Sequence, residues 1–242
     1  MKLVYLDETE STDLKRSSVA ACIFRPDRAL EYRKNLLFRL RDVFERNSND
    51  ATPFPVLHAT KLPEDLSREK RLKLFLAVYS SIGDFAESIG RAGYSWNRQI
   101  FTKHKWISAR FDPKIQARGA ALRTVVLRTW HGSEEEILYF LEQGFSGSEY
   151  IELCYDLNVS LQAHTQLDIL SPDQIEEEPL ISGHKRIAGT YFSRKGDLIQ
   201  SASDFVAYGF HLSDKTERTS FQEEILNSFE IVRSLVRFDE VD

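Results

Sequence analysis

The sequence predicts an α/β protein of the α+β type: a mixed sheet whose early strands are antiparallel, flanked by helices, in one domain over residues 1–242. Short apolar runs, which are typical of buried strands, alternate with longer segments in which apolar residues recur at helical spacing. The first two runs are separated only by a polar stretch, which favours a hairpin. With 42% hydrophobic and 12% aromatic residues, the chain can form a packed core.

The N-terminal elements follow directly from this pattern. Residues 3–6 form an apolar run closed by Asp7 and Glu8, as expected for a buried strand that ends at a sheet edge. Residues 18–25 predict a second strand, antiparallel to the first. Pro26 stands where the first turn of a helix tolerates proline, and helical periodicity continues over 27–46.

The later elements rest on the same criteria. Ser220 and Glu223 form a capping box that favours a final helix. The further predicted elements are a helix over 67–82 with Leu72, Phe75, Leu76 and Tyr79 inward, a strand within 85–96, helical insertions at about 97–131, a strand at 137–141 closed by Glu142, a helix over 149–163, a polar connector over 168–184, a strand at 186–192, a helix over 198–212 and a C-terminal helix over 220–236.

Composition excludes several classes of protein. The formal charge of −5, from 32 basic and 37 acidic residues, argues against coating nucleic acid by bulk charge but leaves room for a local basic groove. Two cysteines, Cys22 and Cys154, are too few for a disulfide scaffold. The acidic N-terminus does not resemble a signal peptide, and no apolar run approaches the roughly 18 residues that span a bilayer. We expect a cytoplasmic protein without a membrane partner.

Three acidic residues share an apolar setting. Asp7 and Glu142 each follow an apolar strand, and Asp204 is the only ionisable residue within the apolar stretch 198–210. A carboxylate in a buried helix needs an arginine, backbone donors, a metal ion or a proton. If the two strands lie together and the late helix crosses their ends, the three carboxylates converge. Such a set of oxygen ligands suits Mg²⁺ or Mn²⁺.

Each acid also has a structural interpretation. A carboxylate that ends a strand commonly marks the turn to solvent, and Asp204 fits a buried pair with an arginine equally well. Glu8 is expected on the opposite face of its strand from Asp7. Asp197 precedes the late helix as an N-cap with Gln200 at the capping-box position.

Other familiar chemistries lack their motifs. The six histidines show no H-E-x-x-H spacing, so a zinc site is not indicated. The phosphate-binding loop G-x-x-x-x-G-K-[ST] and the dinucleotide-binding glycine fingerprint are absent from the sequence. These absences weigh against the common nucleotide-cofactor enzymes.

Three sequence segments resemble a known family. Tyr5-Leu6-Asp7-Glu8 at the end of the first strand, the downstream Leu57-His58-Ala59, and the late segment 199–208 with Asp204 are similar to the bacterial and phage family called domain of unknown function 3800. With 137–142, these anchors span most of the chain. The resemblance implies an RNase H-like fold and a two-metal nuclease or a relative of one.

The resemblance also implies roles for particular residues. Asp7, Glu142 and Asp204 would hold one or two Mg²⁺ or Mn²⁺ ions, and Glu8 is a further acidic candidate beside them. His58 would act as a proton shuttle or phosphate contact, although a lone histidine in an irregular segment is more often structural. Ser193, Arg194 and Lys195 stand where family members often carry a Ser-Lys pair, and would bind substrate phosphate unless they form only a solvated turn.

Three functions remain open at this point. The leading expectation is a metal-dependent phosphodiester hydrolase, that is, a nuclease acting on DNA or RNA. The alternative is a catalytically inactive binding or regulatory module on the same scaffold, for example in phage defence or a toxin system. A third is a hydrolase of a nucleotide or small phosphoester. A protein partner or a homo-oligomer is compatible with each.

Overall fold

The computed structural model describes residues 1–47, 50, 52–96, 113–130, 135–142, 187–193 and 197–242. Within these ranges the chain forms a mixed six-stranded sheet in the order β5-β4-β1-β2-β3-β6. The strands are β1 (Lys2–Ser11), β2 (Arg16–Phe24), β3 (Ser88–Ser95), β4 (Ile137–Glu142), β5 (Ile187–Ser193) and β6 (Val236–Val241).

The sheet has an antiparallel half and a parallel half that meet at β1. β1 pairs with β2 and β2 with β3 in antiparallel fashion, so the predicted early hairpin is confirmed. On its other side β1 pairs in parallel with β4, and β4 with β5. β6 adds to β3 as a parallel strand. The predicted α/β class, a mixed sheet flanked by helices, is therefore confirmed.

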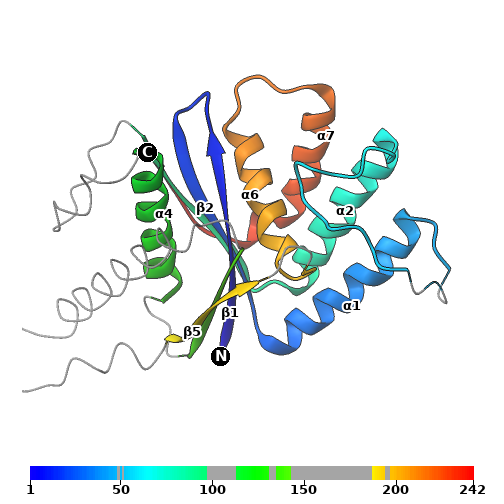
Figure 1. Cartoon of the computed structure of the whole chain (residues 1–242), viewed down its shortest axis with the longest axis horizontal. Coiled ribbons are helices and arrows are strands. Elements are labelled where there is room, and N and C mark those ends of the chain that lie inside the picture. The colour runs from blue at the N-terminus through cyan, green and yellow to red at the C-terminus, as the bar shows by residue number, and fades with distance from the viewer. Residues whose placement is uncertain (48–49, 51, 97–112, 131–134, 143–186, 194–196) are drawn as a thin grey trace, which may run out of the picture.

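Helices cover both faces of the sheet (Figure 1). One face carries four helices and the other carries α4 (Pro113–Trp130). The four are α1 (Pro26–Val43), α2 (Arg68–Phe85), α6 (Ser201–Asp214) and α7 (Ser220–Phe229). None of the helices in the described ranges combines the length and apolar character needed to cross a membrane.

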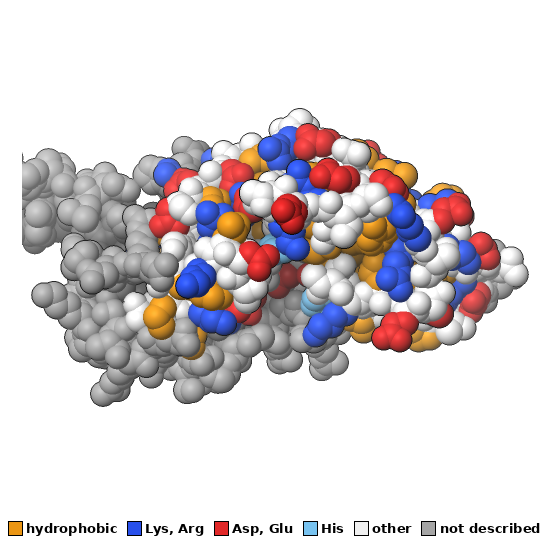
Figure 2. Space-filling model, turned by 90° about the horizontal axis from the view of Figure 1, so that it is seen from above, with side chains coloured by type: hydrophobic (Ala, Val, Ile, Leu, Met, Phe, Trp, Pro, Cys, Tyr) orange, Lys and Arg blue, Asp and Glu red, His pale blue; other side chains and the backbone are white. Residues whose placement is uncertain are grey.

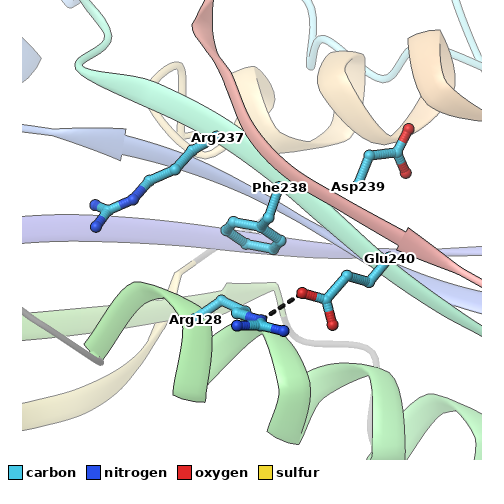
Figure 3. A pocket seen from close by; sticks show the side chains of 5 residues that line it. All are labelled: Arg128, Arg237, Phe238, Asp239 and Glu240. Carbon is cyan, nitrogen blue, oxygen red and sulfur yellow. Dashed lines mark ion pairs between the residues drawn. The ribbon is translucent and has the colours of Figure 1, made fainter.

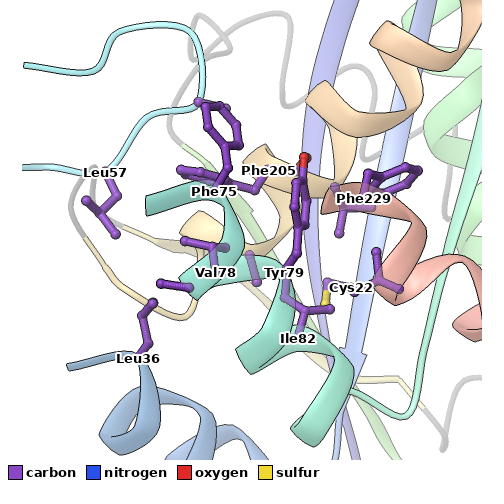
Figure 4. Packing of buried hydrophobic residues seen from close by; sticks show 14 of the residues in the cluster. Cys22, Leu36, Leu57, Phe75, Val78, Tyr79, Ile82, Phe205 and Phe229 are labelled. Atoms are coloured by element: carbon purple, nitrogen blue, oxygen red, sulfur yellow. The ribbon is translucent and has the colours of Figure 1, made fainter. Parts of the chain in front are cut away.

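Side chains of β1 alternate between two cores, as the two-residue period of a strand requires. Tyr5 belongs to the larger core, beneath the four-helix layer, and Leu6 to the smaller core, beneath α4. Figure 4 shows the larger core, in which Tyr79 of α2 lies among Phe75, Phe205 and Phe229. The aromatic rings meet at edge-to-face or tilted angles, which their quadrupoles favour. This core fixes α6 against the sheet.

The first strand is longer than predicted. β1 continues past Asp7 and Glu8 to Ser11, and the turn occupies only residues 12–15, with Lys15 in the left-handed region at φ 46°. The polar residues after Glu8 stay in the strand because Ser11 pairs with Arg16 across the hairpin. The prediction that the two acids end the strand was wrong, and Asp7 lies within the sheet.

The C-terminal region also differs from the prediction. The helix predicted over 220–236 ends at Phe229, and a 3-10 helix over Glu230–Leu235 occupies most of its predicted end. The strand β6, which was not predicted, follows from Val236. The N-cap is Thr219, whose side chain accepts from the Gln222 backbone N–H, rather than Ser220.

The remaining predictions concern α2 and the segments between the later strands. Leu76, expected to face inward from α2, is 46% exposed. The predicted helix over 149–163, the connector over 168–184, and the part of the helical insertions over 97–112 lie outside the described residues. The remainder of that insertion is α4.

Candidate functional site

The candidate site lies where α6 begins over the middle of β1. Gln200, which is 3% exposed, donates from Nε2 to the Leu6 carbonyl oxygen at 2.8 Å and to Ser203 Oγ at 2.9 Å. At the other end of α6, Asp214 Oδ2 lies 3.1 Å from Nη1 of Arg16, which pairs with Ser11 at the end of β1. The helix and the strand therefore run in the same direction.

This geometry brings Asp7 and Asp204 to the same region. Asp7 follows Leu6 by one residue along β1, and Asp204 follows Gln200 by one helical turn on the same helix face. Asp7 lies on the face of β1 shared with Tyr5, which is the face that α6 covers. Both acids are almost completely buried, at 9% exposed for Asp7 and 8% for Asp204.

Asp204 is stabilised by the backbone of a distant loop. The Ala59 backbone N–H donates to Asp204 Oδ2 at 2.6 Å. Asp204 also lies in the first turn of α6, where the positive end of the helix dipole favours a negative charge. The sequence left open whether Asp204 meets an arginine, a backbone donor, a metal ion or a proton. The structure shows a backbone donor.

Tyr79 lies near Asp204 and bonds to the residue that follows it on α6. The Tyr79 hydroxyl donates to the Phe205 carbonyl oxygen at 2.9 Å. Burial, with smaller contributions from Tyr208 and from the charge of Asp204, raises the pKa of Tyr79 well above its ordinary value. Tyr79 therefore stays protonated and acts as a permanent donor rather than as a base.

His58 reaches the site from the same loop as Ala59. Its Nδ1 lies 3.7 Å from Asp204 Oδ2. The same Nδ1 lies 3.3 Å from the Thr60 backbone N–H, which donates to it, and 3.0 Å from the Thr60 hydroxyl. These contacts place the His58 ring between Asp204 and Thr60.

Glu8 faces away from this region. Its Oε1 lies 3.1 Å from Nη1 of Arg118 on α4, on the opposite side of the sheet from Asp7. The same arginine contacts Glu10 through Nη2 at 2.5 Å. These pairs fasten α4 to β1, so the geometry gives Glu8 a structural contact rather than a place beside Asp7 and Asp204.

The third predicted acid lies in register with Asp7. Leu141 pairs with Leu6, so Glu142 occupies the next position of β4, and Glu142 itself pairs with Ser193 at the end of β5. The side chains of Glu142 and Ser193 lie outside the described part of the structure, as do Arg194 and Lys195. Among the residues that the structure describes, no three His, Cys, Asp or Glu side chains form a group that could hold a metal ion.

Asp197 is not the N-cap that the sequence predicted, because α6 begins at Ser201, three residues later than expected, and its N-cap is Gln200. Asp197 Oδ1 accepts from the Ile199 backbone N–H at 2.9 Å, and its carbonyl oxygen accepts from the Ser201 backbone N–H at 3.0 Å. These bonds build the turn that leads into α6. Gln200 is not a capping-box partner: its side chain points to β1 instead.

Gln200 is a site residue that sequence reasoning assigned to the wrong role. It precedes Asp204 by four residues, so both lie on one helix face, and it is polar in an apolar stretch. The sequence could therefore have predicted that the Gln200 side chain makes a buried polar contact. Its partner, a β1 carbonyl, is 194 residues away in sequence and could not be read from the local pattern.

Surface charge around the fold is mixed. Figure 2 shows acidic and basic side chains interspersed over one face of the molecule. A cavity of about 460 Å³ between α4 and β6, shown in Figure 3, is lined by Arg128, Arg237, Phe238, Asp239 and Glu240. Arg128 pairs there with Glu240, and Asp239 pairs with Arg91, so most of its charges are already balanced.

Comparison with models of protein families and with curated proteins finds no match for this chain. The resemblance to domain of unknown function 3800 therefore stays a prediction. The function has to be argued from the site itself.

Proposed function

We propose that the protein is a divalent-metal-dependent phosphodiester hydrolase with an RNase H-like fold, acting on nucleic acid. The observation that carries the proposal is the placement of two buried carboxylates, Asp7 and Asp204, from elements almost 200 residues apart on one face of the sheet. The antiparallel β1–β2–β3 half beside the parallel β4 and β5 agrees with the mixed sheet that the resemblance implies. Glu142, which follows the paired residue Leu141 on β4 as Asp7 follows Leu6 on β1, is the proposed third acid.

The residues present fit Mg²⁺ or Mn²⁺. Asp7 and Asp204 supply carboxylate oxygens, which are the ligands that these hard ions prefer. When bound, such an ion would activate a water and stabilise the leaving oxygen of an in-line attack on phosphorus. Asp7, Asp204 and Glu142 are the residues proposed to hold it.

The chain's own groups have separate roles in this proposal. The Ala59 N–H fixes one oxygen of Asp204, which orients its carboxylate. Gln200 holds the start of α6 on β1 and so sets the relative position of the two acids. His58, 3.7 Å from Asp204 through Nδ1, is the proposed proton shuttle or phosphate contact.

Cleavage by acid-to-amide variants tests the proposal. Asp7→Asn and Asp204→Asn keep the side-chain shape but remove the charge that binds the cation. We expect cleavage of DNA or RNA with Mn²⁺ to fall at least about a hundredfold in each variant. Asp204→Asn retains an oxygen that can accept from Ala59, so its folded stability should stay within about 1 kcal/mol of the wild type.

Asp65→Asn, which removes an exposed acid elsewhere, is the matched control and should cut at the wild-type rate. The proposal fails if the wild-type protein cuts no single- or double-stranded DNA or RNA with either ion. It also fails if the two site variants cut as well as Asp65→Asn does. The inactive binding module would then be the better interpretation.

A further inference from the structure

A second hollow adjoins the candidate site. This cavity, of about 620 Å³, lies between α1, residues 50 and 52–55, and the turn that leads into α6. Its two non-helical walls continue directly into the candidate site: Pro55 precedes His58 by three residues, and Ile199 precedes Asp204 by five. The cavity is therefore formed in part by the segments that lead to His58 and Asp204.

One wall of the cavity is a basic stripe on α1. Arg33, Leu37 and Arg41 are spaced four residues apart, so they follow one face of the helix over about 12 Å. Other basic residues of α1 are used in contacts with the protein: Lys34 pairs with Glu31 and Arg39 with Asp84. Within the described residues, no ion pair or hydrogen bond occupies the guanidinium of Arg33 or Arg41.

The opposite wall is apolar and held in place. Phe54, Leu198 and Ile199 line it. Arg46 lies over the Phe54 ring, 4.6 Å from its centroid, and donates to the Thr52 carbonyl oxygen at 2.7 Å. Arg46 thus holds Phe54 and Thr52 from the protein side.

The acids in the lining are engaged by the protein. Asp50 accepts from Thr52 N–H at 2.9 Å and lies 3.9 Å from Arg46, and these contacts, led by those to Thr52, keep the pKa of Asp50 below its usual range. Asp197 Oδ1 accepts from Ile199 N–H. With Asp50 paired to Arg46, the charges that remain in the lining are those of Arg33 and Arg41 against the single carboxylate of Asp197, so positive charge is in excess.

We propose that this cavity binds one nucleotide unit of a single-stranded substrate, next to the bond that is cut. Arg33 and Arg41 bind its phosphates, and the base lies against Phe54, Leu198 and Ile199. The volume lies within the range of small-ligand pockets, so it fits a nucleotide but not a duplex. The pairing of arginine with an apolar wall is the chemistry that binds single strands with little sequence preference. The proposal rests on the proposed function and names the substrate class of that site.

Binding measured apart from cleavage tests the proposal. Fluorescence anisotropy of a labelled single-stranded thymidine decanucleotide, with Ca²⁺ in place of Mn²⁺, reports affinity at several salt concentrations. We expect Arg33→Gln/Arg41→Gln to bind at least tenfold more weakly than the wild type. The slope of log affinity against log salt should fall by about 1.4, since each single-strand phosphate contact contributes about 0.7.

The matched control is Lys34→Gln/Lys73→Gln, which removes two exposed charges that each pair with a neighbouring glutamate on its own helix. It should change the affinity less than twofold. Equal loss in both double variants would overturn the cavity proposal, because the effect would then be one of net charge. Absence of wild-type binding to the decanucleotide, or tighter binding of a duplex of equal length, would overturn it as well.

The two proposals fail separately. If the arginine variant binds like the wild type while Asp7→Asn and Asp204→Asn lose cleavage, the hydrolase proposal is supported and the cavity proposal is wrong. If the arginine variant loses binding while the wild type cuts nothing with Mn²⁺, the cavity proposal is supported and the hydrolase proposal is wrong.

Discussion

His211 shows how burial controls ionisation at a single residue of α6. It lies half-buried and stacks on Tyr208, with ring centroids 6.2 Å apart. Burial first, and then the charge of Lys215, lower the pKa of His211, while Asp214 and Asp13 oppose this and Arg91 adds slightly to it. The folded protein therefore binds this proton less readily than the unfolded chain does.

The sign of this shift gives a pH dependence. Because the folded pKa lies below the unfolded value of about 6.5, the contribution of His211 to stability is present above that pH and is lost as the pH falls through it. We expect His211→Gln to flatten this part of the curve. Urea unfolding of both proteins between about pH 8 and pH 5 measures the difference.

The comparison isolates one group because all other titrating residues are common to the two proteins. The expected result is a free-energy difference between wild type and His211→Gln that changes with pH around the histidine pKa. A constant difference across the whole range would contradict the assignment.

At the scale of elements, α6 carries the candidate site because it is buried almost all round. Its apolar composition predicted this burial correctly, and ten of its fourteen residues are buried. The helix approaches α7 so closely that a Cβ at Gly209 would overlap the ring of Phe229, which is completely buried. Glycine at this position is therefore required by packing rather than by backbone conformation.

Gly209→Ala tests this close approach. Alanine favours a helix interior over glycine by about 1 kcal/mol, but displacing Phe229 should cost more, so we expect a net loss of about 1–2 kcal/mol in unfolding free energy. Gly83→Ala on α2 is the control, since a Cβ there would meet Ile231 Cγ2 at 3.2 Å and needs a shift of only a few tenths of an ångström. Urea unfolding should place Gly83→Ala within about 1 kcal/mol of the wild type. Equal effects of the two changes on the unfolding free energy would show that the Phe229 ring can move aside at little cost.

At the scale of the whole molecule, Arg91 joins the edge strand to the sheet and to α6. It is 3% exposed, and Nη1 lies 2.7 Å from Asp214 Oδ2 on α6, while Nη2 lies 2.8 Å from Asp239 Oδ1 on β6. Nη1 also donates to the Phe210 carbonyl oxygen at 3.1 Å, and the guanidinium lies over the Phe210 ring. One side chain thus connects three elements that are distant in sequence.

Arg91→Met should be strongly destabilising. It leaves Asp239 without its ion pair, Asp214 with Arg16 alone, and the Phe210 carbonyl oxygen without this donor, so we expect a loss of about 3–5 kcal/mol in unfolding free energy. Arg237→Met, which removes an exposed charge from β6, should change stability by at most about 0.5 kcal/mol. Denaturant unfolding compares the two, and a loss below about 1 kcal/mol for Arg91→Met would show that the network contributes little.

The amino-acid sequence by itself determined the class of the fold, the early hairpin and the burial of α6. These properties depend on local periodicity, which a strand or helix carries within its own residues. It also singled out Asp204, because a lone acid in an apolar helix is conspicuous. It missed β6 over Val236–Val241, because the predicted C-terminal helix ended at residue 236 and no strand was assigned to the residues after it.

Only the tertiary structure decided what surrounds the acids. The donor to Asp204 comes from Ala59, 145 residues away, and the anchor of Gln200 is a backbone carbonyl of β1. The pairing of Ser11 with Arg16 kept Asp7 inside a strand that local polarity had appeared to end. Contacts of this kind depend on which distant backbone groups the packed sheet and helices bring together, and backbone groups are the same in every residue, so no local pattern encodes them.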